Sequence, residues 1–297
     1  MKDIDPGPWV SVIIPTCNRA EFLGKAVASV LAQTYPYFEL LVIDDGSEDE
    51  TAELLASFKP PVRYIRQENR GPAAARNLGI REARHDLLAF LDSDDTFDRE
   101  KLAIQVAAME KAPEYLISHT QETWFRNGRF LNQKKIHRKE SGDIFARSLN
   151  LCVVGMSTVM ARRRLFQLFG SFDEELRCCE DYDLWLRVSA CQPFLLIDRP
   201  LTVKDGGRPD QVSFQYRVGM DRFRIRAMEK IVAAGNLTPR QEQLAREELV
   251  RKCRVYGNGC LKHGHREEGE KYLALIHRYG SGHSWQGGPG FVFGSEG

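Results

Sequence analysis

The chain has 297 residues, with 42 Lys and Arg against 41 Asp and Glu, and 42% of the residues are hydrophobic. This length suits one large domain, or one domain with an appendage. The near-neutral charge argues against a dedicated nucleic-acid-binding protein, which normally carries a strongly basic domain. No apolar run approaches the roughly 20 residues that cross a bilayer, and residues 1–8 contain no basic-then-apolar leader, so we expect a cytoplasmic protein.

The first third of the chain alternates predicted strands with predicted helices. Apolar runs predict strands at residues 10–14, 39–43, 62–66 and 87–91. The helix after the first strand has one apolar face, made by Leu23, Ala26, Val27, Val30 and Leu31. Ser47 and Glu50 have the spacing of a capping box for a second helix, and Gly71 precedes a third helix that runs to residue 83. This alternation predicts an α/β fold with a mostly parallel sheet, whose loops after residues 14, 43 and 91 emerge at one edge.

The middle of the chain is less regular. Asp98 is the expected N-cap of a helix, and residues 115–131 predict a hairpin that turns at Asn127 and Gly128. Residues 134–139 are basic and predicted to be a loop. A strand is expected at residues 151–160, followed by a short helix from residue 162 that ends at Gly170.

The C-terminal part has helical periodicity. Two helices are predicted at residues 215–235 and 238–261, the second with a capping box between Thr238 and Gln241, and a third follows Gly264. We therefore divide the chain into an α/β domain (1–214), a helical extension (215–279) and a Gly- and Ser-rich tail (280–297) that we expect to be disordered. A basic stripe on the first helix of the extension is expected to be a solvated face, with attraction to anionic lipid as the alternative; it comprises Arg222, Arg224, Arg226 and Lys230.

Three carboxylates follow the apolar strand at residues 87–91. Asp92, Ser93 and Asp94 form a D-x-D pattern, with Asp95 next to it. Alternate side chains of an extended backbone point to the same side and can share one hard cation. Ligands of open α/β sheets lie beyond the carboxyl ends of such strands, so we expect a divalent ion that also holds a diphosphate.

Five segments in order resemble family 2 glycosyltransferases, which have the GT-A fold. They are residues 12–19 (VIIPTCNR), 42–47 (VIDDGS), 75–79 (ARNLG), 90–95 (FLDSDD) and 180–187 (EDYDLWLR), and the resemblance covers about residues 9–215. It implies a metal-dependent, inverting transfer of a sugar from a nucleotide-sugar to a hydroxyl group. A UDP-sugar is the most common donor in the family, and the acceptor would be a saccharide, a lipid-linked saccharide or another alcohol.

The resemblance also implies roles for single residues. It places the nucleoside against Thr16, Asn18 and Arg19, stiffened by Pro15, and against Asp44 or Asp45, a choice that the sequence leaves open. Arg76 would contact the base or phosphate, Asp92 and Ser93 the ribose, and Asp94 would bind Mn²⁺ or Mg²⁺. The divalent ion would stabilise the charge that grows on the leaving diphosphate.

Glu180 and Asp181 begin a helix whose Leu184, Trp185 and Val188 should face the core. The attacking hydroxyl must lose its proton, and a carboxylate is a suitable general base. The resemblance assigns this role to Asp181, with Glu180 orienting the acceptor.

Lys204 and Arg208 belong to a segment that resembles the loop closing over the diphosphate. Relatives often carry His near position 208, and Arg cannot ligate a metal because its guanidinium stays protonated.

Two alternatives remain at this stage. A sugar-1-phosphate nucleotidyltransferase shares the architecture, but it usually has a Gly-rich loop after the first strand, and residues 15–19 contain no glycine. A nucleotide-sugar-binding protein without catalysis is the other, which the presence of Asp94 and Asp181 disfavours. We expect no nucleic-acid partner and allow for peripheral membrane association.

The seven cysteines include no C-x-x-C pair, so we expect reduced thiols.

Overall fold

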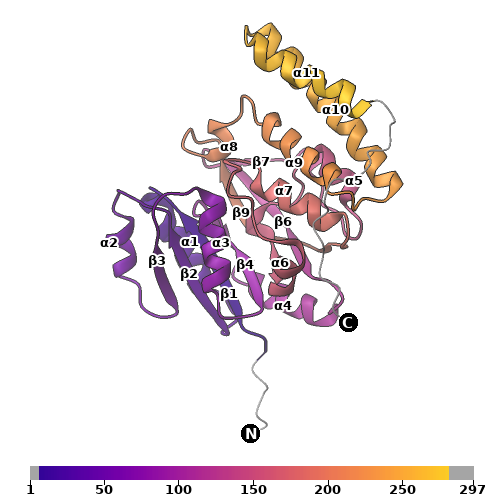
Figure 1. Ribbon diagram of the computed structural model, residues 1–297. Helices are drawn as coiled ribbons and strands as arrows, with labels where there is room; N and C mark the ends of the chain where they lie inside the picture. The colour runs from indigo at the N-terminus through magenta and orange to yellow at the C-terminus, as the bar shows by residue number, and fades with distance from the viewer. Residues whose placement is uncertain (1–6, 281–297) are drawn as a thin grey trace.

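The computed structural model describes residues 7–280. Within these residues, nine strands form one sheet in the order β3-β2-β1-β4-β8-β6-β9-β5, with β7 paired to β6 (Figure 1). The strands are β1 (Val10–Thr16), β2 (Phe38–Asp44), β3 (Val62–Arg66), β4 (Leu87–Phe90), β5 (Asp95–Phe97), β6 (Ile117–Arg126), β7 (Arg129–Leu131), β8 (Met160–Arg162) and β9 (Leu195–Gly206). The predicted α/β class is confirmed.

The first four strands are parallel, as predicted, and both faces of β1, β2 and β4 are buried, whereas β3 at the edge is partly exposed. Helices α1 (Ala20–Leu31) and α4 (Lys101–Lys111) pack on the face that contains Val12 and Val42. Helices α3 (Pro72–Glu82), α6 (Arg163–Phe169) and α7 (Glu180–Ser189) pack on the face that contains Ile13 and Ile43. Because successive strand residues point to opposite faces, continuous apolar runs are needed here. The prediction for Leu31 is wrong, since this residue lies at the exposed end of α1.

The other half of the sheet is mixed. Strand β8 runs antiparallel to β4 and β6, whereas β9 runs parallel to β6 and antiparallel to β5. The pairing of β5 with β9 places Asp95 opposite Lys204 and so brings β9 next to the acidic motif. The predicted hairpin is confirmed: Asn127 and Gly128, with φ of 50° and 71°, make the turn between β6 and β7.

Three local predictions are wrong. Ser47 does not cap α2 (Thr51–Ala56), because its hydroxyl accepts a hydrogen bond from the Asn18 amide instead. Helix α4 begins at Lys101, since residues 95–97 form β5 and position its start after Asp98. In place of a strand at residues 151–160, the chain forms a 3₁₀ turn, η2 (Met156–Thr158), before β8. The basic stretch contains a second 3₁₀ turn, η1 (Lys135–His137), and ends at a buried residue, Lys139.

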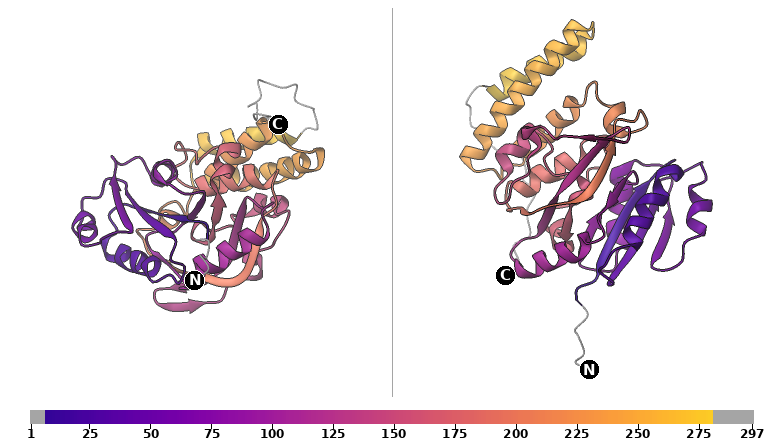
Figure 2. Two further views of the ribbon diagram at one scale, coloured as in Figure 1. Left: turned by 90° about the horizontal axis from the view of Figure 1, so that it is seen from below. Right: turned by 180° about the vertical axis from the view of Figure 1, so that it is seen from behind.

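The C-terminal helices are α8 (Val212–Gln215), α9 (Asp221–Ala233), α10 (Pro239–Lys262) and α11 (Arg266–Gly280). The Thr238 capping box of α10 is confirmed. One apolar cluster joins α9 and α10 to α5 (Phe145–Asn150) and α7 of the preceding domain. Helices α10 and α11 lie side by side at the end of the molecule away from β3 (Figures 1 and 2). Gly280 ends α11, and the rest of the expected disordered tail lies outside the described residues.

The basic stripe on α9 is not a free cationic surface. Arg226 pairs with Glu175, Arg224 with Asp221 at 3.1 Å, and Lys230 with Asp173 and Asp183 at 2.7 and 2.6 Å. The pairs made by Arg226 and Lys230 tie α9 to the loop before α7 and to α7 itself, whereas the Arg224 pair lies within α9. Among the described helices, none is both long enough and apolar enough to cross a membrane.

Candidate active site

A cavity of about 1280 Å³ opens where β1, β2 and β4 end. The sequence-predicted residues that line it are Pro15, Thr16, Asn18, Arg19, Asp45, Arg76, Asp92, Ser93, Asp94, Glu180, Asp181 and Lys204. Asp44 and Arg208 are absent from its lining. The loops converge because parallel strands place their carboxyl ends at one edge of the sheet.

The loop after β1 forms one end of the cavity. Its backbone is fastened to the loop after β2: the Asp45 amide donates to the Thr16 carbonyl at 2.8 Å, and the Asn18 amide donates to the Ser47 hydroxyl at 2.9 Å. Asn18 has a left-handed backbone (φ 53°), and its side chain accepts from the Glu48 amide. The Thr16 hydroxyl is buried and has no hydrogen-bond partner among the described residues. A ligand group in the cavity could satisfy it.

Asp44 and Asp45 have different surroundings in the structure. Asp44 is fully buried and accepts hydrogen bonds from the Ser47 amide (2.8 Å) and the Tyr64 hydroxyl (2.7 Å), so it supports the loop behind the cavity. Burial and this carboxylate raise the pKa of Tyr64 to about 12. Asp45 borders the cavity and accepts from the Gly71 amide at 2.7 Å, which holds the start of α3. Of the two candidates, only Asp45 is placed to meet a ligand.

Arg76 joins two parts of the site. Its guanidinium donates to Glu180 and, at 2.8 Å, to Asp92. Burial disfavours a charge here, but Asp92 and Glu180 outweigh this and raise the pKa of Arg76. Burial, with Asp181 adding to it, raises the pKa of Glu180 despite the arginine. Arg76 therefore fixes the positions of two acids more directly than it offers a free group to a phosphate.

Asp181 lies in the first turn of α7, where the helix dipole favours a negative charge. Buried Leu184, Trp185 and Val188 anchor the helix, as predicted. The Asp181 carboxylate accepts from the Cys152 thiol at 3.4 Å, and the described residues place no basic group within ion-pair distance of it. Unlike Glu180, this carboxylate is therefore available to accept a proton from a substrate.

Asp94, the expected metal ligand, is surrounded by donors. One of its oxygens accepts from Arg19 at 2.9 Å, Arg208 at 2.6 Å and Gln211 at 2.9 Å. Among residues 7–280, no group of three or more His, Cys, Asp or Glu side chains could hold a metal ion. The two guanidinium groups at this carboxylate repel a divalent cation, so the residues as arranged fit such an ion poorly.

Asp95 and Lys204 meet beside Asp94, with the Lys204 ammonium 3.9 Å from the Asp95 carboxylate. Burial raises the pKa of Asp95 well above its usual range, although its carboxylate also accepts from the Ser157 hydroxyl at 2.6 Å. Burial lowers the pKa of Lys204, but Asp95 and Glu122 outweigh it and raise the pKa overall. The lysine thus carries its positive charge into the cavity.

Several cavity residues were not predicted as site residues. Glu122 is buried on β6 and lies 3.3 Å from the Lys139 ammonium, and one of its oxygens has no hydrogen-bond partner among the described residues. Trp124 also lies on β6, Cys152 is in the loop before η2, and Gln211 and Arg224 come from the C-terminal region. These residues are far apart in the chain and have no motif of their own, so only the folded chain brings them together.

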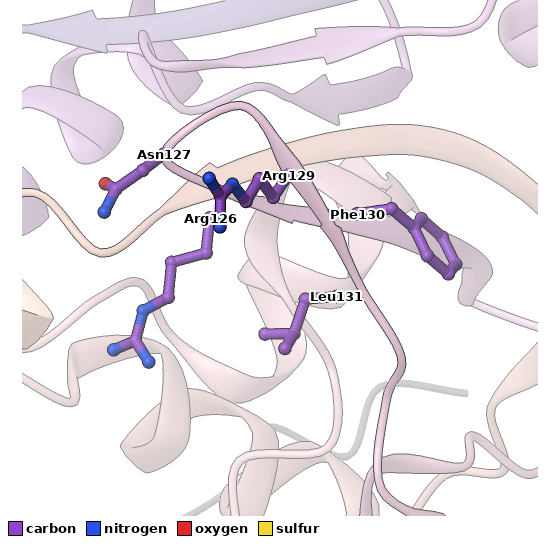
Figure 3. A pocket seen from close by; sticks show the side chains of 5 residues that line it. All are labelled: Arg126, Asn127, Arg129, Phe130 and Leu131. Atoms are coloured by element: carbon purple, nitrogen blue, oxygen red, sulfur yellow. The ribbon is translucent and has the colours of Figure 1, made fainter.

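A second hollow of about 520 Å³ lies beside the hairpin of β6 and β7. The five side chains that line it spread in different directions instead of converging, and none is acidic (Figure 3). Phe130 is 62% exposed there. The larger cavity is therefore the candidate active site.

A family model described as "Glycosyl transferase family 2" matches residues 11–169, more than half of the chain. The chain belongs to glycosyl transferase family 2. An uncharacterized glycosyltransferase of Rickettsia felis is 40% identical over 197 residues, which are 65% of this chain and 32% of that protein. The family 2 chain described here thus spans about a third of this relative's length.

Another family 2 relative has a more specific description. WfgD of Escherichia coli, a UDP-Glc:α-D-GlcNAc-diphosphoundecaprenol β-1,3-glucosyltransferase, is 34% identical over 184 residues, which are 60% of this chain and 69% of WfgD. Solved structures support the GT-A fold. TarS of S. aureus in complex with UDP-GlcNAc has a TM-score of 0.70 and 21% identity, covering 90% of this chain and 79% of that chain.

The mannosyltransferase PcManGT of Pyrobaculum calidifontis, solved with GDP-Man and Mn²⁺, has a TM-score of 0.61 and 18% identity, covering 93% of this chain and 84% of that chain. At this identity the likeness concerns the fold alone. Membership of family 2 disfavours the nucleotidyltransferase alternative.

Proposed function

We propose that the protein is an inverting glycosyltransferase that moves a sugar from a nucleotide-sugar, a UDP-sugar in the first instance, to a hydroxyl of a saccharide or lipid-linked acceptor. The single observation that carries the proposal is the placement of Asp181. This carboxylate, which has no ion pair among residues 7–280, lies in the same cavity as the loops after β1, β2 and β4, which have the family's nucleotide-binding pattern.

The cavity brings together groups with different chemistry. Thr16, Asn18 and Asp45 offer hydroxyl, amide and carboxylate groups that suit a base and a ribose. The guanidinium and ammonium groups of Arg19 and Lys204 line the same cavity and suit the diphosphate. Asp181 also lines it, and we assign the acceptor hydroxyl to this carboxylate. Attack on the sugar from the side opposite to the diphosphate would invert the anomeric centre.

The proton and the leaving group then have separate partners. Asp181 would accept the proton from the acceptor hydroxyl as that oxygen attacks the anomeric carbon. The bond from this carbon to the diphosphate breaks, and the nucleoside diphosphate keeps the electron pair. Glu180 is held by Arg76, so we assign it a positioning role and not that of the base.

The acceptor and location are proposals of the same kind. WfgD acts on a diphosphoundecaprenol-linked sugar, as its description states. By this similarity we propose a lipid-linked acceptor and a cytoplasmic protein that works at the inner face of a membrane. Mn²⁺ or Mg²⁺ at Asp94 stays a prediction from the family, and the contacts of this residue do not favour it.

A thermal-shift panel tests the function. Nucleotide-sugars that bind only the folded protein raise its melting temperature by mass action. We expect UDP-sugars to raise it and sugar 1-phosphates alone to leave it unchanged. Release of UDP from the donor that gives the largest shift, in the presence of an acceptor extract, then tests transfer. No shift with any nucleotide-sugar, with or without Mn²⁺, would contradict the proposal.

A further inference from the structure

We propose that Arg19, Arg208 and Lys204 together bind the donor diphosphate in place of a divalent metal ion. The inference rests on the proposed function, because it concerns how the same donor is held. It also concerns the metal ion that the family resemblance predicts at Asp94, which the contacts of this residue do not favour.

The first argument is the state of the acidic motif. Asp94 has a single oxygen that receives three donors, two of them guanidinium groups, and its side chain is only 12% exposed. Asp92 is bound by Arg76 at 2.8 Å, and Asp95 is buried against Ser157 at 2.6 Å. Each carboxylate of the motif therefore already has a donor, and the two guanidinium groups at Asp94 would repel a divalent cation bound there.

The second argument is that Arg208 is held in place by several contacts. Its guanidinium lies 4.1 Å from the centre of the Phe22 ring, which favours a cation. The Gln211 side chain accepts hydrogen bonds from the amides of Gly207 (2.8 Å) and Arg208 (3.2 Å), and it donates to Asp94. The loop between β9 and α8 is thus folded around this arginine, which argues against an accidental contact.

The third argument is that the three cations come from separate elements and lie at the neighbouring carboxylates Asp94 and Asp95. Arg208 does not itself line the cavity, but it pairs with two residues that do, Asp94 and Asp210. Arg19 precedes α1, Lys204 lies on β9, and Arg208 lies in the following loop. Lys204 borders the cavity, and its one ion-pair partner among the described residues is Asp95 at 3.9 Å. An ammonium group with such distant pairing still has hydrogen bonds to donate, which a phosphate oxygen can accept.

Binding a diphosphate here requires an exchange of anions. The side chain of Asp210 is 44% exposed and pairs with Arg19 at 3.1 Å and with Arg208 at 3.6 Å. A phosphate can replace this carboxylate at both arginines, since a guanidinium offers paired N–H groups to either anion. Asp210 would then turn to water, while the more buried Asp94 keeps the arginines oriented.

Calorimetric titration of the full chain with UDP and with GDP tests the inference. We expect the dissociation constant of the nucleotide that binds to be the same in excess EDTA and in Mn²⁺. Binding at least about tenfold tighter with Mn²⁺ would overturn the inference and leave the proposed function intact. Absence of binding by both nucleotides in both buffers would contradict the proposed function and the inference together.

A variant pair tests the arginine directly. In EDTA, Arg208→Gln should weaken nucleotide binding by about tenfold or more, because a charge-assisted contact to phosphate is lost. Arg199→Gln is the matched control, since Arg199 is an exposed arginine near the start of β9 that pairs with Glu100, and it should bind as the wild type does. Circular dichroism confirms that both variants fold. Unchanged binding by folded Arg208→Gln would overturn the inference, and the comparison of EDTA with Mn²⁺ on the wild type decides it should the variant not fold.

Discussion

Arg76 on α3 and Glu180 on α7 form an ion pair whose two side chains are each 8% exposed. The pair connects α3, which follows the loops after β1 and β2 in the chain, to α7, which carries Asp181. A second contact, from Arg76 to Asp92 at 2.8 Å, includes the acidic motif. One guanidinium group thus holds three segments of the cavity in position: α3, the acidic motif and the start of α7.

Replacement of Arg76 with Met should destabilise the protein strongly. It leaves two carboxylates without their counter-charge in a buried place, and breaking such a pair costs about 3 kcal/mol or more. Urea unfolding measures the difference in free energy. Arg81→Met is the control, because Arg81 lies exposed on the same helix and its loss should change the free energy by less than about 0.5 kcal/mol. Equal effects of the two substitutions would show that the ion pair does not stabilise this junction.

Asp181→Asn should abolish turnover and retain donor binding. The amide cannot accept a proton, and loss of a general base lowers turnover by about a hundredfold or more. The shift in melting temperature with UDP should stay as in the wild type, because the proposed function assigns Asp181 to the acceptor and not to the nucleotide. Asp198→Asn, at an exposed position on β9, is the control and should keep full activity. Substantial turnover by Asp181→Asn would remove this residue as the base.

His119 should make the protein less stable in mild acid. This histidine is fully buried on β6, and burial lowers its pKa to about 3. The unfolded chain binds a proton below about pH 6.5, whereas the folded chain does not until near pH 3. The unfolded state is therefore favoured as pH falls between these values, by about 1.4 kcal/mol per pH unit from this residue.

Chemical unfolding at several pH values checks this dependence. The His119→Gln variant, whose amide can still donate to the Glu140 carbonyl, should lose less stability between pH 6.5 and pH 4.5 than the wild type, by about 2 kcal/mol or more. The control, His263→Gln, changes an exposed histidine and should keep the wild-type slope. Identical slopes for all three proteins would contradict the assignment to His119.

Gly79 on α3 lies against the sheet, and a Cβ atom there would be 2.4 Å from the side chain of Ile13 on β1. Gly79→Ala should therefore cost about 1–3 kcal/mol, since helix and strand must move apart. It should also weaken donor binding, because Arg76 is one turn away. The control is Gly259→Ala in α10, where a Cβ atom has open space, and it should stabilise by about 0.5 kcal/mol. Thermal unfolding distinguishes the two, and a neutral Gly79→Ala would contradict the close packing.

Local patterns predicted the parallel half of the sheet well. Strand β3 has the predicted bounds, and α3 begins at Pro72 as expected, because long apolar runs and a Gly-Pro start are strong local signals. Prediction failed where distant contacts override local preference. Ser47 holds the loop after β1 instead of capping α2, and residues 95–97 pair with β9 before α4 can begin.

The acidic residues of the site show the same difference between what the local sequence predicts and what distant contacts decide. That Asp92, Asp94 and Asp95 follow a buried strand, and that Glu180 and Asp181 begin a helix, could be inferred from the sequence alone because these features depend on near neighbours. Which acid is paired, buried or free depends on residues from other parts of the chain. Arg76 pairs with Glu180, and Asp181 has no ion pair within the part of the chain that the structure describes, whereas Arg19 and Arg208 pair with Asp94. The partner of each charged side chain is set by distance in the folded protein and not by distance along the chain. Only the tertiary structure therefore decided these roles.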